Sequence, residues 1–236
     1  MPTVLLLRHG RSTANTSGVL AGWTPGVALD DRGREQAEAI ALRLGGLPLA
    51  AIVASPLQRC QETVAPLVKK TGLKRVTEKR LGECRYGDWT GRKLSELFKE
   101  PLWKVVQAHP SAAVFPGPEG ESMAAMQARG VAAIRDWDAR IAAEHGPGAV
   151  WVACSHGDVI KAIVADAMAT HLDNFQRILI DPGSITAISY TETRPFVLRV
   201  NDVGGDVAAY TPPPPAKAKR GRKRSSDAVV GGGAGA

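Results

Sequence analysis

The sequence predicts an α/β fold, a three-layer sandwich with a mostly parallel central sheet and helices on both faces. Short, nearly continuous apolar runs at 3–7, 50–54 and 149–154 are typical of strands that are buried on both faces. A segment with apolar residues at every third or fourth position follows each run. This alternation of strand and helix is the pattern of a parallel sheet covered by helices.

The remaining elements follow from the same periodicities. Four helices are expected, at 31–44, 57–70, 121–144 and 159–170. Pro66 lies inside the second helix and is expected to bend it or to mark its true start. Further strands are expected at 74–77, 184–190 and 196–200. Between the third strand and the long helix, 93–118 contains two amphipathic pieces separated by Pro101 and a loop rich in Pro and Gly.

Composition points to an ordinary globular protein. Of the 236 residues, 44% are hydrophobic and 22% are charged, and a domain of about 200 residues buries roughly 70% of its unfolded surface. Three cysteines without a C-x-x-C spacing argue against a disulfide framework and a thiolate zinc site. The sequence shows neither a signal-peptide pattern nor an apolar run of about 18 residues, so we expect a cytoplasmic protein without a membrane partner.

The basic charge is concentrated after the expected globular domain, 1–205. The formal net charge is +7, but 211–236 holds six Lys or Arg residues and one Asp. The residues at 1–210 hold 24 basic and 22 acidic side chains. Because 206–236 is Pro-rich, then basic, then rich in Gly and Ala, we predict a disordered tail. A solvated tail is the favoured interpretation, and binding of nucleic acid or another anionic partner is the alternative.

Polar residues that can carry chemistry follow three of the predicted strands. The strands at 3–7, 50–54 and 149–154 run into RHG, SPLQR and SHG, and a loop after 74–77 supplies a glutamate. Ligands bind at the carboxyl ends of strands in sheets of this kind. We therefore expect two His, two Arg and one Glu to converge there: Arg8, His9, Arg59, Glu83 and His156.

This set of side chains suits phosphoryl transfer. Guanidinium and imidazolium groups bind a phosphate dianion through charge-assisted hydrogen bonds. A neutral imidazole can be the nucleophile, and a carboxylic acid can protonate the leaving alkoxide. Gly10 and Gly157 would let the backbone approach the phosphate. No His/Glu pair or Asp cluster suggests a metal, and we expect no cofactor. Ser155, His156 and Asp158 are too close in sequence for a hydrolase triad, and Asp158 is expected to cap the helix beside it.

Four motifs occur in the order LLLRHGRSTAN, SPLQRC, LGECRYGDWTG and CSHGD. Together they resemble the histidine phosphatase superfamily, in its phosphoglycerate-mutase-like branch, over roughly residues 3–200. The resemblance implies a histidine phosphatase domain at 1–205 with a phosphoglycerate-mutase-like fold. It also implies that a small phosphorylated metabolite is the substrate.

The resemblance implies a role for each matching residue. His9 would be the nucleophile that becomes the phosphohistidine. Arg8 and Arg59 would hold the transferred phosphoryl group, with His156 as a protonated donor to its oxygens. Glu83 would protonate the leaving group and then act as base on the attacking water.

The same motifs imply a second group of substrate-binding residues. Asn15 would add a hydrogen bond to the phosphoryl group, and Gly22 and Tyr86 match positions that line the substrate pocket of the mutases. Gly157 follows His156 in the fourth motif and would join the phosphate site. Arg11 stands where the mutases often have an acid.

Three functions remain open from the sequence. The favoured one is a phosphatase for a small phosphomonoester, because the lid segment, between the strand at 74–77 and the helix at 121–144, is apolar. The mutases that the chain resembles carry a lysine shortly after the G of the L-x-E-x-x-x-G-x-x-x-G stretch, and an adjacent Arg pair. Here Lys93 stands one position earlier than that lysine, and no Arg-Arg pair occurs between Tyr86 and Arg129. The second is a phosphomutase of the phosphoglycerate mutase type. The third is a non-catalytic binding protein that acts through its basic tail. The oligomeric state, a homo-oligomer included, stays open.

Overall fold

The computed structural model describes residues 2–205 together with 230, 231 and 233. Six strands form one sheet in the order β3-β2-β4-β1-β5-β6. The strands are β1 (Thr3–Arg8), β2 (Leu49–Ala54), β3 (Arg75–Thr77), β4 (Val150–Ser155), β5 (Ile185–Tyr190) and β6 (Pro195–Asp202). The helices are α1 (Thr13–Ser17), α2 (Asp31–Leu44), α3 (Gln58–Thr71), α4 (Leu94–Leu97), α5 (Pro101–Ala108), α6 (Met123–His145) and α7 (Gly157–Ala167).

The sheet is mostly parallel, as predicted. β1 and β2 both pair in parallel with β4, and β2 pairs in parallel with β3. β5 alone runs opposite to the other five strands, because it pairs antiparallel with both β1 and β6. In the register of the sheet Arg8 lies opposite Ser155, and Ala54 opposite Cys154. The three central strands therefore end level with one another, so the residues that follow them share one edge of the sheet.

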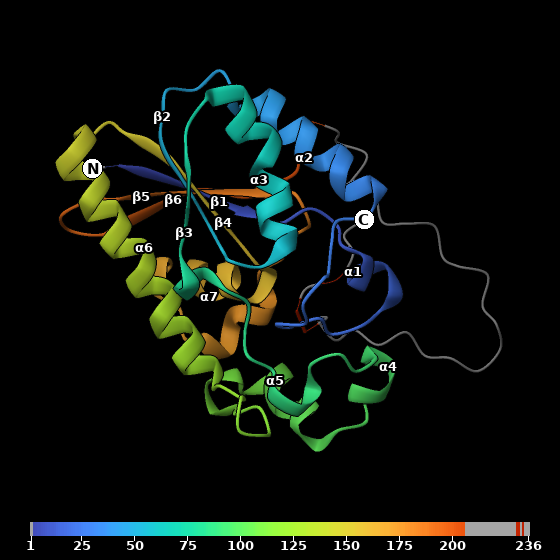
Figure 1. The fold of residues 1–236 in the computed structure, drawn as a ribbon. Coiled ribbons are helices and arrows are strands. Elements are labelled where there is room, and N and C mark those ends of the chain that lie inside the picture. Colours follow the sequence, from blue (N-terminus) through green and yellow to red (C-terminus); the bar gives the residue numbers. More distant parts are fainter. Residues whose placement is uncertain (1, 206–229, 232, 234–236) are drawn as a thin grey trace.

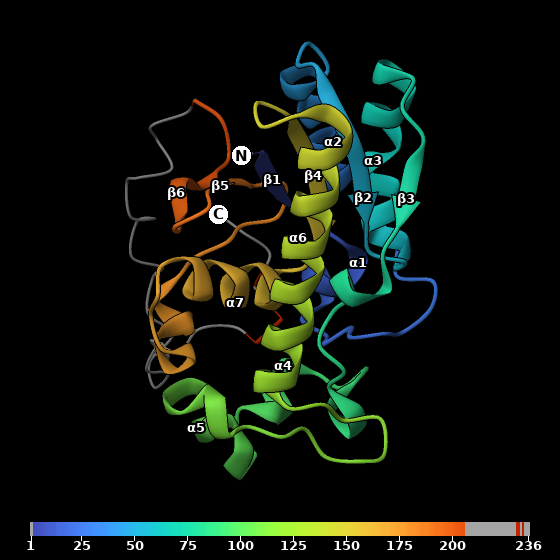
Figure 2. The same cartoon turned by 90° about the vertical axis from the view of Figure 1, so that its left-hand side faces the viewer.

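Helices cover both faces of the sheet, which confirms the three-layer sandwich. Figures 1 and 2 show α2 and α3 on one face and α6 and α7 on the other. Successive residues of β1 alternate between the two resulting cores: Val4 and Leu6 pack on the α6 side, and Leu5 and Leu7 on the α2 side. Both faces of the strand are buried, which explains its continuous apolar sequence.

Two helices differ from their predicted form at the start. α3 begins at Gln58, so Pro66 lies inside the helix and does not mark its start. α7 begins at Gly157, and its N-cap residue is His156. The prediction that Asp158 caps this helix is wrong, because Asp158 is the second helical residue and its buried side chain accepts a hydrogen bond from Tyr86 instead.

The segment between β3 and α6, which contains α4 and α5, lies at the bottom of the view in Figure 1, below the sheet. Pro101 is the first residue of α5, where its missing N–H is not needed, and so it separates α4 from α5 as predicted. Trp89, Trp103 and Phe115 pack together within this segment. These side chains belong to the same buried core as Val4 and Leu6 of β1.

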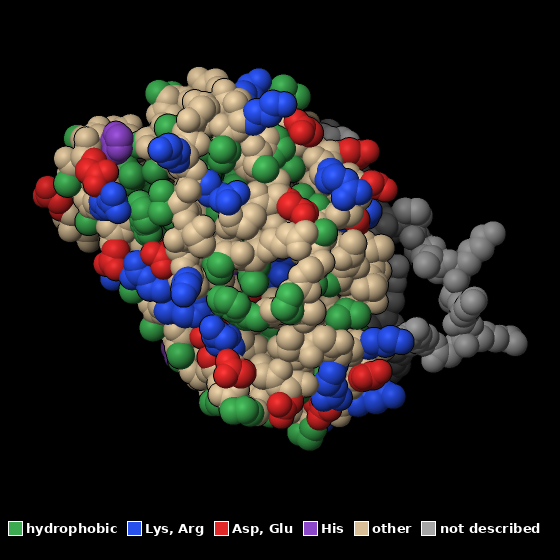
Figure 3. Space-filling model, in the orientation of Figure 1, with side chains coloured by type: hydrophobic (Ala, Val, Ile, Leu, Met, Phe, Trp, Pro, Cys, Tyr) green, Lys and Arg blue, Asp and Glu red, His purple; other side chains and the backbone are tan. Residues whose placement is uncertain are grey.

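Charges of both signs are mixed on the face of the domain seen in Figure 3. Figure 3 shows Lys and Arg side chains lying among Asp and Glu side chains on the face in view. This agrees with the nearly balanced count of basic and acidic residues at 1–210. None of the helices within the described part of the chain has both the length and the apolar character needed to cross a bilayer.

Most of the predicted tail, at 206–229, 232 and 234–236, lies outside the described residues, and so does its basic run. Val230, Gly231 and Gly233 are described, and they lie against the domain at the edge of the sheet where the strands end. The composition of the segment does not predict these contacts.

Candidate active site

His9 follows directly after β1 and is almost completely buried. Its Nδ1 lies 2.7 Å from the carbonyl oxygen of Gly10, and Nε of Arg59 donates to its Nε2 at 3.3 Å. A carbonyl oxygen only accepts, so Nδ1 carries the proton and Nε2 presents a lone pair. Burial, together with the charges of Arg59 and Arg8, holds the pKa of His9 well below its ordinary value. The imidazole is therefore neutral, as a nucleophile must be.

Arg59 reaches the site from the first turn of α3. Besides contacting His9, it donates from Nη2 to the carbonyl oxygen of Gly22 at 3.0 Å. Thr63, one turn further along, donates to the carbonyl of Arg59 at 2.6 Å and accepts from the amide of Gly10 at 2.9 Å. This hydroxyl ties the start of α3 to the loop after His9 and so fixes the two functional residues relative to each other.

Glu83 lies in the loop after β3 and is buried. Its Oε1 accepts from the amide of Cys84 at 3.0 Å, and its Oε2 lies 3.8 Å from Nδ1 of His156. Burial, assisted by the nearby charge of Asp158, raises the pKa of Glu83 to about 7. A carboxyl group with this pKa can hold or release a proton near neutral pH, as a general acid and base must.

His156 lies at the junction of β4 and α7, and the helix starts at the next residue, Gly157. Its Nε2 and the hydroxyl of Ser55 are 2.8 Å apart, and its ring is 5.1 Å from the ring of His9. That His156 is a protonated donor to a bound phosphoryl group stays a prediction. Burial, with the charge of Arg59, lowers the pKa of His156 well below its ordinary value, so the ring is neutral without a bound anion.

Arg8, the last residue of β1, is buried beneath His9. Its Nη1 donates to the carbonyl oxygen of Ile180 at 2.7 Å, and its Nη2 donates to the carbonyl oxygen of Gly233 at 2.9 Å. Burial lowers the pKa of Arg8 to about 10, so the guanidinium still carries its positive charge at neutral pH.

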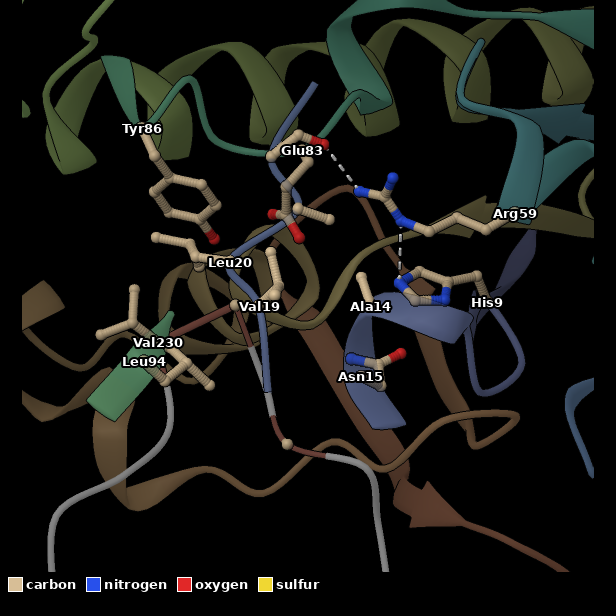
Figure 4. Close-up of a pocket in the computed structure, with 14 residues that line it drawn as sticks. His9, Ala14, Asn15, Val19, Leu20, Arg59, Glu83, Tyr86, Leu94 and Val230 are labelled. Atoms are coloured by element: carbon tan, nitrogen blue, oxygen red, sulfur yellow. Dashed lines mark hydrogen bonds between the residues drawn. The ribbon is translucent and has the colours of Figure 1, made fainter. Parts of the chain in front are cut away.

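His9, Arg59 and Glu83 line a pocket, whereas Arg8 and His156 are not among its described lining residues. The predicted residues Asn15, Gly22 and Tyr86 also line it, and Gly157 does not. Figure 4 shows His9, Arg59 and Glu83 at one end of the pocket and apolar side chains at the other. The apolar wall consists of Ala14, Val19, Leu20, Ala21 and Leu94, and Val230 of the C-terminal segment packs against it.

Comparison with known proteins places this site in a family. The family model of the histidine phosphatase superfamily (branch 1) matches residues 4–203. This chain belongs to the histidine phosphatase superfamily. The resemblance of its four motifs to that superfamily is thereby confirmed.

The relatives of this chain include both phosphatases and mutases. A probable phosphatase of Schizosaccharomyces pombe is 29% identical over 80% of this chain and 87% of its own length. A 2,3-bisphosphoglycerate-dependent phosphoglycerate mutase of Thermoplasma acidophilum is 27% identical over 89% and 98%. The mycobacterial glucosyl-3-phosphoglycerate phosphatase complexed with VO3 has a similar structure, with a TM-score of 0.75 and 25% identity over 85% and 99% of the two chains.

Arg129 was not expected at the site from the sequence. From α6 it donates to the carbonyl oxygens of Arg80 at 2.6 Å, Gly82 at 2.8 Å and Glu83 at 2.9 Å. Its position three residues after Met126 puts a cation beside the apolar stripe of a predicted helix, a signal that could have drawn attention to it. The guanidinium group holds the backbone of the loop that carries Glu83.

One aromatic side chain, Trp23, and one hydroxyl side chain, Ser155, also bind the backbone of the loop that carries Glu83. Trp23 donates from Nε1 to the carbonyl oxygen of Glu83 at 2.7 Å. Ser155 donates to the carbonyl oxygen of Leu81 at 2.7 Å, which joins the end of β4 to the same loop. These contacts depend on how the chain folds, and no pattern around the residues reports them.

Two arginines that do not line the pocket, Arg11 and Arg92, form ion pairs. Arg11 pairs with Asp30 at 2.6 Å, and Arg92 of the lid segment pairs with Glu100 at 2.6 Å. Among the described residues Arg59 is the only Lys or Arg that lines the pocket. Arg8 donates a hydrogen bond to Gly233, which lines the pocket. Within the described ranges no group of three or more His, Cys, Asp or Glu side chains is arranged to hold a metal ion.

Proposed function

We propose that this chain is a metal-independent phosphatase that hydrolyses a small phosphomonoester through a phosphohistidine on His9. The observation that carries the proposal is the pairing of a neutral imidazole with a carboxyl group of raised pKa. The Nδ1 of His9 is bound to Gly10, so its lone pair on Nε2 is directed into the pocket, where Glu83 also lies. Two guanidinium groups, of Arg8 and Arg59, supply the positive charge that the phosphate needs.

The first step transfers the phosphoryl group to the enzyme. The lone pair on Nε2 of His9 attacks phosphorus, the N–P bond forms, and the bond from phosphorus to the ester oxygen breaks. The protonated carboxyl group of Glu83 gives its proton to that oxygen, which leaves as an alcohol. The N–H of Arg59 that now meets Nε2 turns to a phosphate oxygen in this step.

The second step restores the enzyme. Water attacks phosphorus, the carboxylate of Glu83 takes a proton from it, and the N–P bond breaks to release inorganic phosphate. In both steps His156 donates a hydrogen bond to the phosphate oxygens. If the hydroxyl of Ser55 donates to its Nε2, the proton of the imidazole is on Nδ1, on the side of Glu83 and the pocket.

The wall of the pocket favours a substrate with an uncharged and partly apolar body. Beyond the phosphate-binding groups the described lining offers Leu20, Leu94 and Tyr86, and no second cation for a carboxylate or another phosphate. Phosphoglycerate, the substrate named for a mutase relative, carries such a carboxylate. This difference supports hydrolysis over mutase action. We place the enzyme and its metabolite substrate in the cytoplasm.

The decisive assay compares hydrolysis with isomerisation. The purified protein is incubated with p-nitrophenyl phosphate and EDTA at pH 5–8, beside a conversion of 3-phosphoglycerate to 2-phosphoglycerate primed with 2,3-bisphosphoglycerate. We expect phosphate release without isomerisation. Isomerisation well above hydrolysis would establish the mutase, loss of activity with EDTA would contradict metal independence, and inactivity in both assays would favour a binding protein.

The nucleophile is tested separately. A His9→Ala variant is expected to form no phosphoenzyme from a 32P-labelled phosphomonoester, whereas wild type forms an acid-labile one. His145→Ala is the matched control, because His145 is exposed at the end of α6. Full activity in the His9 variant would refute the mechanism.

A further inference from the structure

The chain itself occupies part of the catalytic pocket. Val230, Gly231 and Gly233 line the pocket together with His9, Arg59 and Glu83. They stand more than twenty residues beyond the last described residue of the domain, Gly205. Figure 4 shows Val230 next to Leu94, across the pocket from the catalytic residues.

Two hydrogen bonds fix this segment to functional groups. The carbonyl oxygen of Gly233 accepts from Nη2 of Arg8 at 2.9 Å. The amide of Gly231 donates to Oδ2 of the buried Asp158 at 2.8 Å. A carbonyl oxygen on a buried guanidinium makes the contact that a phosphate oxygen would make, with weaker charge complementarity. The segment therefore uses a donor that the substrate needs.

The apolar half of the pocket is also filled by the segment. Val230 is 1% exposed and belongs to the same core cluster as Leu20 and Tyr86. This is the surface that would receive the body of the substrate. Both halves of a bound phosphomonoester thus overlap with contacts that the chain makes to itself.

The fit is specific for small residues. Gly231 has a φ of +77°, and a Cβ at this position would lie 2.9 Å from Cδ1 of Leu20. A side chain here would be both strained and in collision with the wall. The glycine-rich sequence after Val230 therefore has a structural reason as well as a compositional one.

We propose that Val230, Gly231 and Gly233 form an autoinhibitory ligand that competes with the phosphorylated substrate for the catalytic pocket. The proposal rests on the proposed phosphatase function, whose pocket it would regulate. Because the competitor is part of the chain, it lowers the apparent affinity for substrate by the fraction of molecules in which the pocket is free. It leaves the rate at saturating substrate unchanged.

The kinetic test uses full-length protein. Gly231→Val should displace the segment by strain and collision, and Val230→Asn should weaken it by removing an apolar contact. If the segment occupies the pocket about 90% of the time, KM for p-nitrophenyl phosphate falls about tenfold at unchanged kcat. Gly205→Val is the matched control, because a Cβ there meets nothing within 4 Å, and its KM should equal that of wild type. An unchanged KM in both pocket variants would overturn the proposal.

A second measurement separates this proposal from the phosphatase function. Hydrogen exchange of the Gly231 amide is followed by NMR in the His9→Ala protein, with inorganic phosphate as the probe. We expect slow exchange without phosphate and faster exchange as phosphate displaces the segment. Rapid exchange without phosphate, or slow exchange at saturating phosphate, would refute autoinhibition even if the enzyme hydrolyses substrates. Protection that phosphate relieves would support it even if no hydrolysis were found.

Discussion

The hydroxyl of Tyr86 donates a 2.8 Å hydrogen bond to Oδ2 of Asp158 at the inner end of the pocket. Both side chains are completely buried. Burial, together with the charge of Asp158, raises the pKa of Tyr86 well above its ordinary value, so the phenol keeps its proton. The same charge contributes to the raised pKa of Glu83. In the proposed mechanism Asp158 would therefore be a positioning residue that acts through these two neighbours.

Replacing Asp158 by Asn should move the pH profile. In wild type, kcat/KM for an alkyl phosphate should fall as pH rises through about 7, because Glu83 loses the proton that the leaving group needs. Without the charge of Asp158 the pKa of Glu83 falls, and this limb should shift to lower pH by on the order of one unit. The measurement is kcat/KM from pH 5 to 8. A Tyr86→Phe control keeps the charge of Asp158, and an equal shift in that variant would contradict the electrostatic cause.

Arg129→Lys should disturb the loop that carries Glu83. Lysine keeps the charge but cannot reach the three carbonyl oxygens that the guanidinium fork binds, so buried acceptors lose their donors. We expect a loss of about 1–3 kcal/mol in the free energy of unfolding and a lower kcat, most marked for alkyl leaving groups. Arg135→Lys, an exposed residue of the same helix, is the control. Equal loss on aryl and alkyl phosphates would indicate a structural role only.

The sequence was sufficient to predict which polar residues gather at one edge of the sheet, because parallel strands end there together. Arg8 and His156 are far apart in the chain, yet each follows an apolar run, and such runs in one parallel sheet end at a common edge. The family resemblance then assigned a role to each residue. Both inferences depend only on features local to each motif, so neither needed the packing of the helices.

The contacts that tune the site were not predictable in this way. Tyr86 and Asp158 are 72 positions apart, and their hydrogen bond exists only because the loop of the third motif packs against α7. A helix-start position favoured the interpretation of Asp158 as a cap, but a buried tyrosine was the stronger partner. The neutral state of His156 likewise depends on burial beside Arg59, which a motif does not report.

Glu78→Gln should change stability with a specific pH dependence. A hydrogen bond from Arg80 lowers the pKa of Glu78 to about 2, below its ordinary value of 4.5, and Trp137 of α6 also donates to it. The folded state therefore favours the carboxylate. Its stabilising effect is complete above about pH 4.5 and is lost as pH falls through about 2. Wild type should have the higher Tm at pH 6, and the difference should vanish towards pH 2. Glu119→Gln, at an exposed position, should show no such trend.

Glu83→Gln should slow hydrolysis by an amount that depends on the leaving group of the substrate. An alkyl phosphate needs a proton on its departing oxygen, so kcat/KM should fall about 10²–10⁴-fold, whereas p-nitrophenolate leaves without one and its kcat/KM should fall much less. The fall at alkaline pH should also disappear, because Gln does not titrate. The matched control is Glu38→Gln on the exposed face of α2, with wild-type kinetics expected. The same loss for both leaving groups would mean that Glu83 acts through the shape or charge of the pocket rather than as a proton donor. In that case the neutral His9 would need its acid elsewhere, and among the described residues that line the pocket Tyr86, with its raised pKa, would be the next to replace.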